Sequence, residues 1–319
     1  MPDAAPRRID VHHHCLPPTY KVRARERIIA GSGIPDRSVL FDWTPERALE
    51  QMDKFGVATA IGSISTPGIW WGDNAEARSL ARECNDFMAG MAQKYPGRFG
   101  FFAATPLPDR DGSLREVEYA LDQLKADGIG ILTSYLDRWP GDPAFDDVFA
   151  EINRRKSVVF VHPTCPTCCL GLIPGVPNAL TEYVFDTTRA IVSFLVNGTF
   201  ARYPDIRFIF CHGGGTIMPI SYRISGMPDR VPGGKENMPN GVLYELKKLF
   251  YDTASAANPP NMAALRALVP LSQILFGSDN PFVPLSAGAQ GVDAFGFTPE
   301  EATAINRENA LQLFPRLKS

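Results

Sequence analysis

The sequence lacks most of the features that assign a chain to a class of protein at once. Its 32 basic and 35 acidic residues leave a formal net charge of only −3, which gives no electrostatic reason to expect binding to nucleic acid or to an anionic membrane. No window approaches the roughly 18 apolar residues of a membrane-spanning helix. Six cysteines in 319 residues do not form a disulfide framework. We therefore expect reduced thiols and a cytoplasmic protein.

The chain also shows no targeting segment, internal repeat, low-complexity tract or linker. The first residues, MPDAAPRR, lead directly into the strand-like IDV, without an apolar signal region or a cleavage site. The composition is that of a globular enzyme, because 45% of the residues are hydrophobic and can form a substantial core. We expect a single domain over residues 1–319.

Short apolar runs alternate with longer segments of helical periodicity along the whole chain. Most runs lack strict polar alternation, which is typical of parallel strands buried on both faces. Strands are expected at residues 8–11, 57–64, 99–104, 129–133, 158–162, 207–212, 249–253 and 273–278. Helices are expected at residues 44–55, 75–95, 113–126, 143–156, 181–202, 259–268 and 298–314.

Eight strands that alternate with helices favour a (β/α)8 TIM barrel of the α/β class, with loop insertions at its C-terminal face. The alternative is an open doubly wound sheet. However, no GxGxxG motif follows the first strand, and that strand ends in three histidines. The proline- and glycine-rich stretch 227–241 is expected as a long excursion near the active-site face, as either a lid or an oligomer contact.

The first expected strand ends in a histidine pair of the form HxH. Residues i and i+2 of a strand point to one face, so His12 and His14 project together while His13 faces the other way. The C-terminal ends of barrel strands form the mouth where barrel enzymes keep their active sites. Two adjacent imidazoles suit a divalent metal ion. The alternative is a solvated or tag-like histidine-rich start.

Three more polar residues stand at the ends of later expected strands. His162 ends VVFVH, although a lone histidine at such a position is more often structural. His212 ends FIFCH, and the three glycines after it allow backbone to approach a ligand closely. Asp279 follows ILFGS. Because all these strand ends meet at one face of a barrel, the pattern predicts a mononuclear metal site there.

The motifs together resemble a known family. HxH on the first strand, a strand-terminal HPT, FCHGGG and FGSDNPF, in this order, resemble the amidohydrolase superfamily. More specifically, they resemble its branch of metal-dependent non-oxidative decarboxylases, which includes 2-amino-3-carboxymuconate-6-semialdehyde decarboxylase and the salicylate-type, or hydroxybenzoate, decarboxylases. The resemblance extends from Ile9 to Phe314 and includes DTT at 186–188 and YRI at 222–224.

The resemblance implies a (β/α)8 barrel with one divalent ion, usually zinc and in some members manganese. Many hydrolytic members hold a second metal through a carboxylated lysine, whereas Thr133 and Ser134 end the fourth expected strand here, which implies one ion. His212 would be the catalytic acid or base, and Asp279 could also carry the proton. The implied metal ligands are His12, His14 and His162, with Asp279 as a ligand or near-ligand.

The resemblance also implies substrate-binding arginines and a homodimer or dimer of dimers. Arg37 lies in the loop after the first strand, near the place of a carboxylate-binding arginine, although it could equally be a solvated loop residue. Arg223 lies eleven residues after His212, which matches a second arginine that crosses a two-fold interface in the resembling decarboxylases. A guanidinium fork fits a carboxylate bidentately. The alternative for Arg223 is a surface position on a helix.

Aromatic and thiol side chains are further candidates for residues that line the active-site mouth of the barrel. Trp70, Trp71 and Phe282 could flank a planar ring, although packing is the more common role of such residues. The CPTCC cluster at 165–169 has no second CxxC to complete a structural zinc site. We expect incidental thiols there, with pocket lining as the alternative.

The expected reaction is decarboxylation of a small aromatic or enol-like carboxylate with an ortho hydroxyl. A metal would chelate the carboxylate and phenolate oxygens, and Asp279 or His212 would protonate the ring carbon. A variant of this mechanism uses a metal-bound hydroxide formed with His212 as base. A hydrolase of an amide, lactone or C–C bond would need the same metal-activated water and stays open. A non-catalytic metal-binding protein is the third alternative.

Overall fold

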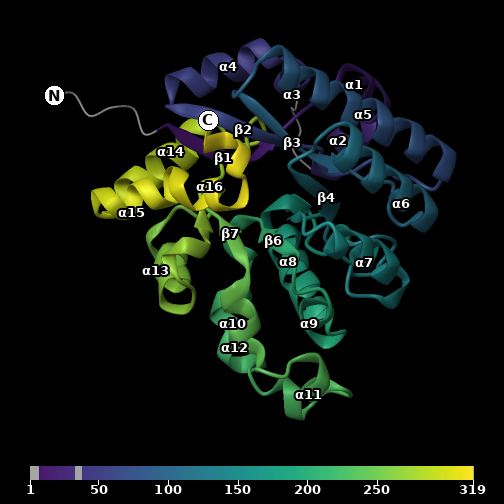
Figure 1. Ribbon diagram of the computed structural model, residues 1–319, viewed down its shortest axis with the longest axis vertical. Helices are drawn as coiled ribbons and strands as arrows, with labels where there is room; N and C mark the ends of the chain where they lie inside the picture. The colour runs from purple at the N-terminus through teal and green to yellow at the C-terminus, as the bar shows by residue number, and fades with distance from the viewer. Residues whose placement is uncertain (1–6, 33–37, 319) are drawn as a thin grey trace.

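A computed structural model describes residues 7–32 and 38–318 (Figure 1). Its eight parallel strands form one sheet in the order of the sequence, β1 to β8, with helices packed around it. The predicted (β/α)8 barrel is therefore confirmed. The strands are β1 (Arg8–His14), β2 (Val57–Ser63), β3 (Phe99–Ala104), β4 (Gly128–Leu132), β5 (Val158–His162), β6 (Arg207–Phe210), β7 (Phe250–Asp252) and β8 (Ile274–Leu275).

Helices fill the connections between the strands. The α-helices are α1 (Pro18–Arg23), α2 (Arg25–Ser32), α3 (Ser38–Phe41), α4 (Pro45–Lys54), α5 (Asn74–Lys94), α6 (Arg110–Glu118), α7 (Asp146–Arg154), α8 (Asn178–Val196), α9 (Thr199–Arg202), α10 (Ile217–Ile224), α11 (Gly234–Asn237), α12 (Val242–Lys248), α13 (Pro259–Leu268), α14 (Leu285–Ala294), α15 (Pro299–Thr303) and α16 (Asn309–Leu313). Short 3-10 or π segments are η1 (Tyr119–Gln123), η2 (Pro143–Phe145), η3 (Thr167–Cys169), η4 (His212–Gly214), η5 (Met227–Asp229), η6 (Leu271–Gln273), η7 (Ala304–Glu308) and η8 (Pro315–Lys318). Among the described residues, no helix combines the length and apolar character needed to span a bilayer.

The barrel closes between β1 and the segment that follows β8. The Val11 amide donates to the Phe276 carbonyl at 3.0 Å, and the Asp279 amide donates to the His12 carbonyl at 2.8 Å. The His14 amide donates to the Asn280 carbonyl at 2.7 Å. This closure places the segment after β8 directly beside the HxH motif, although Asp279 stands 265 positions after His14 in the chain.

Aromatic side chains fill the barrel below its mouth. The rings of Phe102 and Phe160 stack with centroids 4.9 Å apart and an interplanar angle of 5°. The His12 ring meets Phe160 edge-on at 5.1 Å, so the upper edge of this apolar layer is the floor of the histidine site. Both phenylalanines are fully buried, which keeps water away from the inner side of the imidazoles.

The excursion at 227–241 lies elsewhere than the sequence suggested. It folds into η5 and α11, and the Asn237 side chain donates to the Val196 carbonyl at 2.6 Å. Val196 is the last residue of α8, at the end of that helix that leads back to the start of β6. The expectation of an excursion near the active-site face is therefore wrong, because this contact holds it at the opposite end of α8.

Candidate active site

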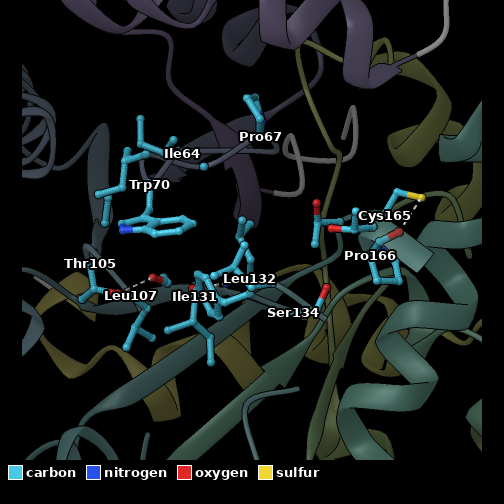
Figure 2. A pocket seen from close by; sticks show the side chains of 18 of the residues that line it. Ile64, Pro67, Trp70, Thr105, Leu107, Ile131, Leu132, Ser134, Cys165 and Pro166 are labelled. Carbon is cyan, nitrogen blue, oxygen red and sulfur yellow. Dashed lines mark hydrogen bonds between the residues drawn. The ribbon is translucent and has the colours of Figure 1, made fainter. Parts of the chain in front are cut away.

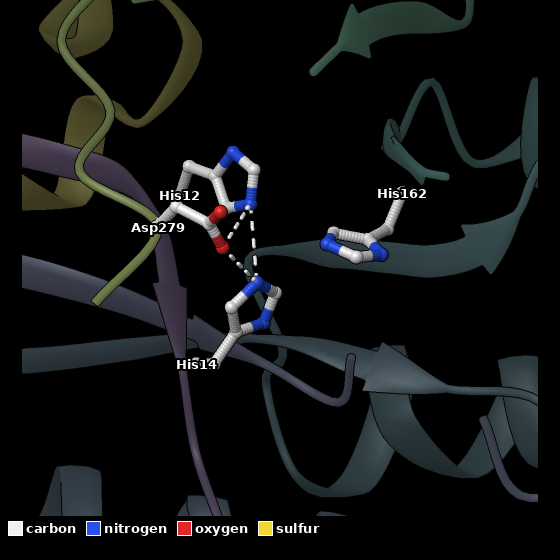
Figure 3. A group of neighbouring side chains, drawn as sticks. All are labelled: His12, His14, His162 and Asp279. Atoms are coloured by element: carbon white, nitrogen blue, oxygen red, sulfur yellow. Dashed lines mark hydrogen bonds and ion pairs between the residues drawn. The ribbon is translucent and has the colours of Figure 1, made fainter. Parts of the chain in front are cut away.

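Three histidines and one aspartate converge at the mouth of the barrel (Figure 3). The ligand atoms of His12, His14, His162 and Asp279 all lie within 4.8 Å of one another. Nε2 of His12 lies 3.1 Å from Nε2 of His14. Oδ1 of Asp279 lies 3.0 Å from His14 Nε2 and 3.4 Å from His12 Nε2. The structure thus brings together the four residues for which the sequence predicted metal ligation.

Strand geometry positions the histidines as the sequence predicted. His12 and His14 point toward one another at the end of β1, whereas Nδ1 of His13 lies 3.1 Å from the Asp10 carboxylate, outside the cluster. Nδ1 of His14 lies 3.1 Å from the Ser63 hydroxyl, which fixes the orientation of that ring. His162 ends β5, and its ring meets His14 edge-on with centroids 4.7 Å apart.

His212 and Asp279 lie beyond the strands that were expected to end at or beside them. β6 ends at Phe210 and β8 at Leu275. His212 has φ 54° and Asp279 has φ 64°, which is the left-handed region that interrupts strand pairing. Gly215 follows in the same turn, where a Cβ atom would collide with the Val184 carbonyl oxygen. These backbone turns, rather than strand ends, aim the two side chains across the mouth.

His212 faces the carboxylate of Asp279 without joining the tight cluster. Its Nε2 lies 3.5 Å from Asp279 Oδ2, whereas the other oxygen of the same carboxylate contacts His12 and His14. The rings of His212 and His12 have centroids 5.1 Å apart. His212 is therefore close enough to exchange a proton with a molecule held at the cluster.

Burial and neighbouring charges shift the pKa values of the groups in the cluster. Burial lowers the pKa of His14, and burial together with the neighbouring histidines lowers the pKa of His162 well below its ordinary value. Burial alone would raise the pKa of Asp279, but the contacts with His12, His14 and His212 hold it well below the usual range. Two neutral imidazoles and an ionised carboxylate therefore face one point.

This donor set fits a divalent metal ion. Imidazole nitrogen and carboxylate oxygen are the usual ligands of zinc, and ligand atoms placed tetrahedrally about 2.1 Å from zinc are about 3.4 Å apart. The distances of 3.0–3.4 Å among His12, His14 and Asp279 are close to that spacing. Nδ1 of His162 is buried and has no hydrogen-bond partner in the part of the chain that the structure describes. A bound metal ion would give the nitrogen and oxygen atoms of this cluster a common partner.

One further residue was missed by the sequence analysis. Asp252, the last residue of β7, is fully buried, and its Oδ2 lies 2.7 Å from His12 Nδ1. The available signal was a carboxylate at the end of the seventh expected strand, 249–253. It could not be paired with His12 from the sequence, because 240 positions separate the two residues.

Comparisons with known proteins give the family of this chain. Residues 9–316 match the family model described as Amidohydrolase. The chain belongs to the amidohydrolase family. It is 36% identical to 6-methylsalicylic acid decarboxylase from Aspergillus aculeatus, over 98% of this chain and 97% of that relative. It is 32% identical to 6-methylsalicylic acid decarboxylase from Penicillium expansum, over 98% of this chain and 97% of that relative.

A solved structure shows the same fold. The dihydroxybenzoic acid decarboxylase from Polaromonas sp. JS666, with bound manganese and the inhibitor 2-nitroresorcinol, has a TM-score of 0.82 and 20% identity. The match covers 98% of this amidohydrolase and 97% of that chain. The family predicted from the four motifs is therefore confirmed, and the predicted carboxy-lyase class agrees with the 6-methylsalicylic acid decarboxylases, which match over almost their whole length.

A cavity of about 350 Å³ opens above the cluster of this amidohydrolase. His162, His212 and Asp279 lie in its wall. Its other polar lining residues are Ser65, Thr66, Tyr183 and Ser255. Its apolar lining residues are Ile28, Ala179, Leu180, Val184, Phe282 and Val283. Two candidate metal ligands beside apolar lining residues suit a planar aromatic acid.

Of the two predicted substrate-binding arginines, Arg223 does not line this cavity. Arg223 lies on α10 and is exposed, one residue after Tyr222, which is 76% exposed. Arg37 falls outside the described residues. None of the described residues that line the cavity is a lysine or an arginine. Among the described residues, the metal-ligand cluster is thus the main feature that could bind a carboxylate.

The predicted aromatic and thiol candidates divide between two cavities. Phe282 lines the cavity above the cluster and meets His14 edge-on at 5.1 Å. Trp70 and Cys165 line a separate cavity of about 180 Å³ (Figure 2), whereas Trp71 packs against the core. Burial raises the pKa of the Cys165 thiol to about 12, so it stays protonated at neutral pH. Among the described residues, the thiols of CPTCC join no metal-sized cluster.

Proposed function

We propose that this amidohydrolase is a metal-dependent non-oxidative decarboxylase of salicylate-type acids, in which the carboxyl group stands ortho to a phenolic hydroxyl. The observation that carries the proposal is the convergence of His12, His14, His162 and Asp279, two of which (His162 and Asp279) also line a largely apolar cavity. The activity of the 6-methylsalicylic acid decarboxylases that match over almost the whole chain supports it. The reaction releases carbon dioxide and leaves a phenol.

The metal ligands in this proposal are His12, His14, His162 and Asp279. A bound divalent ion supplies Lewis-acid stabilisation of the adjacent carboxylate and phenolate oxygens of the substrate. Three imidazoles and one carboxylate favour zinc, with manganese as the alternative. Among the described residues there is one cluster of three histidines and an aspartate, which supports one ion for each chain.

The protein residues supply binding and proton transfer. The apolar walls hold the ring and exclude water, which favours the departure of uncharged carbon dioxide. Proton transfer to the ring carbon that bears the carboxyl group interrupts aromaticity, and breaking of the carbon–carbon bond restores it. His212 is our preferred donor, because it faces Asp279 across the mouth and stands apart from the tight cluster. Asp279 is the alternative donor.

The proposal includes a homodimer or dimer of dimers. None of the described residues that line the cavity is a lysine or an arginine. A cationic side chain from another subunit could therefore bind the substrate carboxylate. Arg223 of a partner subunit would supply it, since Arg223 is exposed on α10 and could cross a two-fold interface. Arg37, which lies outside the described residues, remains the candidate within this chain.

Metal analysis combined with a gas-release assay tests the proposal. We expect about one tightly bound divalent ion per chain, with carbon dioxide and the corresponding phenol formed from 6-methylsalicylate or a related hydroxybenzoate. His162→Ala should lose the ion and the activity, since it removes one of the few ligands. Two tightly bound ions per chain would contradict the mononuclear site. Hydrolysis of lactones or amides without gas release would favour the hydrolase instead.

A further inference from the structure

One buried carboxylate touches both the proposed metal site and the proposed proton donor. Oδ2 of Asp252 lies 2.7 Å from Nδ1 of His12. Its Oδ1 accepts hydrogen bonds from the backbone amides of His212, at 2.9 Å, and Ala254, at 3.1 Å. Asp252 and His12 are both fully buried, so water does not compete for these contacts.

We infer that Asp252 is a positioning residue that fixes the His12 tautomer and the His212 backbone at the same time. The inference rests on the proposed function only in taking His12 as a metal ligand. It concerns how this chain orients that ligand, and it adds a residue to the site that neither the motifs nor the metal cluster includes.

The first part of the inference follows from hydrogen-bond chemistry. A carboxylate accepts hydrogen bonds and does not donate them, so the proton between Asp252 and His12 belongs to Nδ1 of the imidazole. In the neutral imidazole, which is the form that binds a metal, the lone pair is then on Nε2. That atom faces the cluster, 3.1 Å from His14 Nε2 and 3.4 Å from Asp279 Oδ1. Such a carboxylate–histidine pair selects the tautomer that a metal requires.

The contact between Asp252 and His12 is a hydrogen bond and not a second metal site. Together with the Cys211 thiol, the two residues form another group of potential ligand atoms within 4.8 Å of one another. However, His12 Nδ1 and Asp252 Oδ2 are 2.7 Å apart, which is shorter than the spacing of about 3.4 Å between tetrahedral ligands of one zinc ion. Their separation is that of a charge-assisted hydrogen bond.

The second part of the inference concerns the backbone of His212. This residue has φ 54°, a conformation that is unfavourable for a residue with a Cβ atom. β6 has already ended, so its amide is not held by a neighbouring strand, and Asp252 accepts its hydrogen bond instead. One side chain thus sets the positions of the metal ligand and the proton donor relative to each other.

Asp252→Asn tests the inference because it separates charge and tautomer from size. The carboxamide oxygen can still accept from the His212 and Ala254 amides, whereas the NH2 group then faces His12 Nδ1 and donates to it. That contact places the His12 proton on Nε2, where it blocks metal binding. We expect zinc affinity to fall about 10–100-fold, with the thermal midpoint of the apoprotein close to that of the wild type.

Imidazole ¹⁵N–¹H spectra of the zinc-loaded protein provide a readout that a merely structural role would not change. The wild type should show a slowly exchanging His12 Nδ1–H proton, and Asp252→Asn should lose it. The matched control is Asp127→Asn, which removes a buried carboxylate paired with Arg316 at the start of β4, the opposite end of the barrel. That control should keep both the zinc affinity and the Nδ1–H signal.

Each outcome decides one question. Unchanged zinc affinity and an unchanged Nδ1–H signal in Asp252→Asn would overturn the inference. If Asp252→Asn does not fold, the wild-type spectrum decides, because a proton-free His12 Nδ1 in the zinc-loaded protein also overturns it. Failure of the wild type itself to bind zinc or manganese would instead contradict the proposed metal site.

Discussion

At the scale of single residues, the mouth of the barrel separates the groups that could hold a metal from the group that could move a proton. His12 and His14 contact one oxygen of Asp279, whereas His212 faces the other oxygen at 3.5 Å. Strand periodicity was sufficient to predict the shared face of His12 and His14. It could not pair Asp252 with His12, since only the folded barrel brings the side chain at the end of β7 to the side chain at the end of β1, with β8 between the two strands.

His212→Asn tests the division between the two groups. Asparagine tolerates the left-handed backbone of this position, so the fold and the bound metal should be retained. Turnover should fall by about 10²–10⁴-fold, which is the usual contribution of a positioned acid or base. Elemental analysis and carbon dioxide release measure the two effects on one sample. Loss of metal in parallel with turnover would make His212 a ligand.

At the scale of elements, the sequence located strands better than helices. The expected strand 158–162 agrees with β5, because a continuous apolar run is an unambiguous signal for a buried strand. The expected helix at 298–314 is divided into α15, η7 and α16, since a π turn interrupts its hydrogen bonding. Helices α1 to α3 were not predicted, because their short segments carry little periodic pattern.

A buried aspartate on α8 ties this helix to the loop after β4. Asp186 accepts hydrogen bonds from the hydroxyls of Thr133 and Ser134, at 2.5 and 2.9 Å, and from the Trp139 indole at 2.7 Å. Asp186→Ala leaves these donors without their acceptor, so it should lower the free energy of unfolding by about 3 kcal/mol. Asp186→Asn should cost less, because it keeps one carbonyl oxygen and a similar shape. Urea unfolding measures both variants.

The same residue predicts a pH dependence. Burial raises the pKa of Asp186 above its ordinary value of 3.8, although its three hydrogen bonds oppose the shift. The folded protein then holds this proton more firmly than the unfolded chain, so the stabilisation is present below about pH 4 and declines as the pH rises through the raised pKa. Asp186→Asn lacks this decline. Its deficit against the wild type should therefore shrink from about pH 4 to pH 7, and a constant deficit would contradict the assignment.

At the scale of the whole molecule, the order of the strands in the barrel could be predicted from the sequence. The position of the 227–241 excursion and the subunit contacts could not. Eight apolar runs in alternation with helices fixed the topology, because parallel strands need a crossover between them. The place of the 227–241 excursion depends on the contact of Asn237 with the end of α8, for which the sequence has no local signal. The same holds for the proposed partner subunit, since a dimer interface has no simple periodicity in the sequence.

Subunit complementation tests the proposed dimer. Arg223→Ala and His212→Asn chains should each be nearly inactive alone. In a mixed dimer, one of the two pockets combines the intact His212 of one chain with the intact Arg223 of the other, so random exchange should restore about a quarter of the wild-type sites. Activity is measured after mixing, with mass-tagged chains to verify exchange. No recovery despite verified exchange would place Arg223 within its own chain's site or outside catalysis.

The left-handed backbone at His212 and Asp279 sets thermal stability against catalytic activity in this enzyme, because the residues that the chemistry needs are not the ones that the backbone favours. Each residue holds a conformation that glycine adopts freely, at a cost on the order of 1 kcal/mol. Selection for heat resistance alone would accept glycine at both positions and remove the proposed proton donor and one proposed metal ligand. Laboratory evolution toward a more stable variant therefore needs a screen for turnover in every round, because glycine at either position would remove a proposed functional side chain.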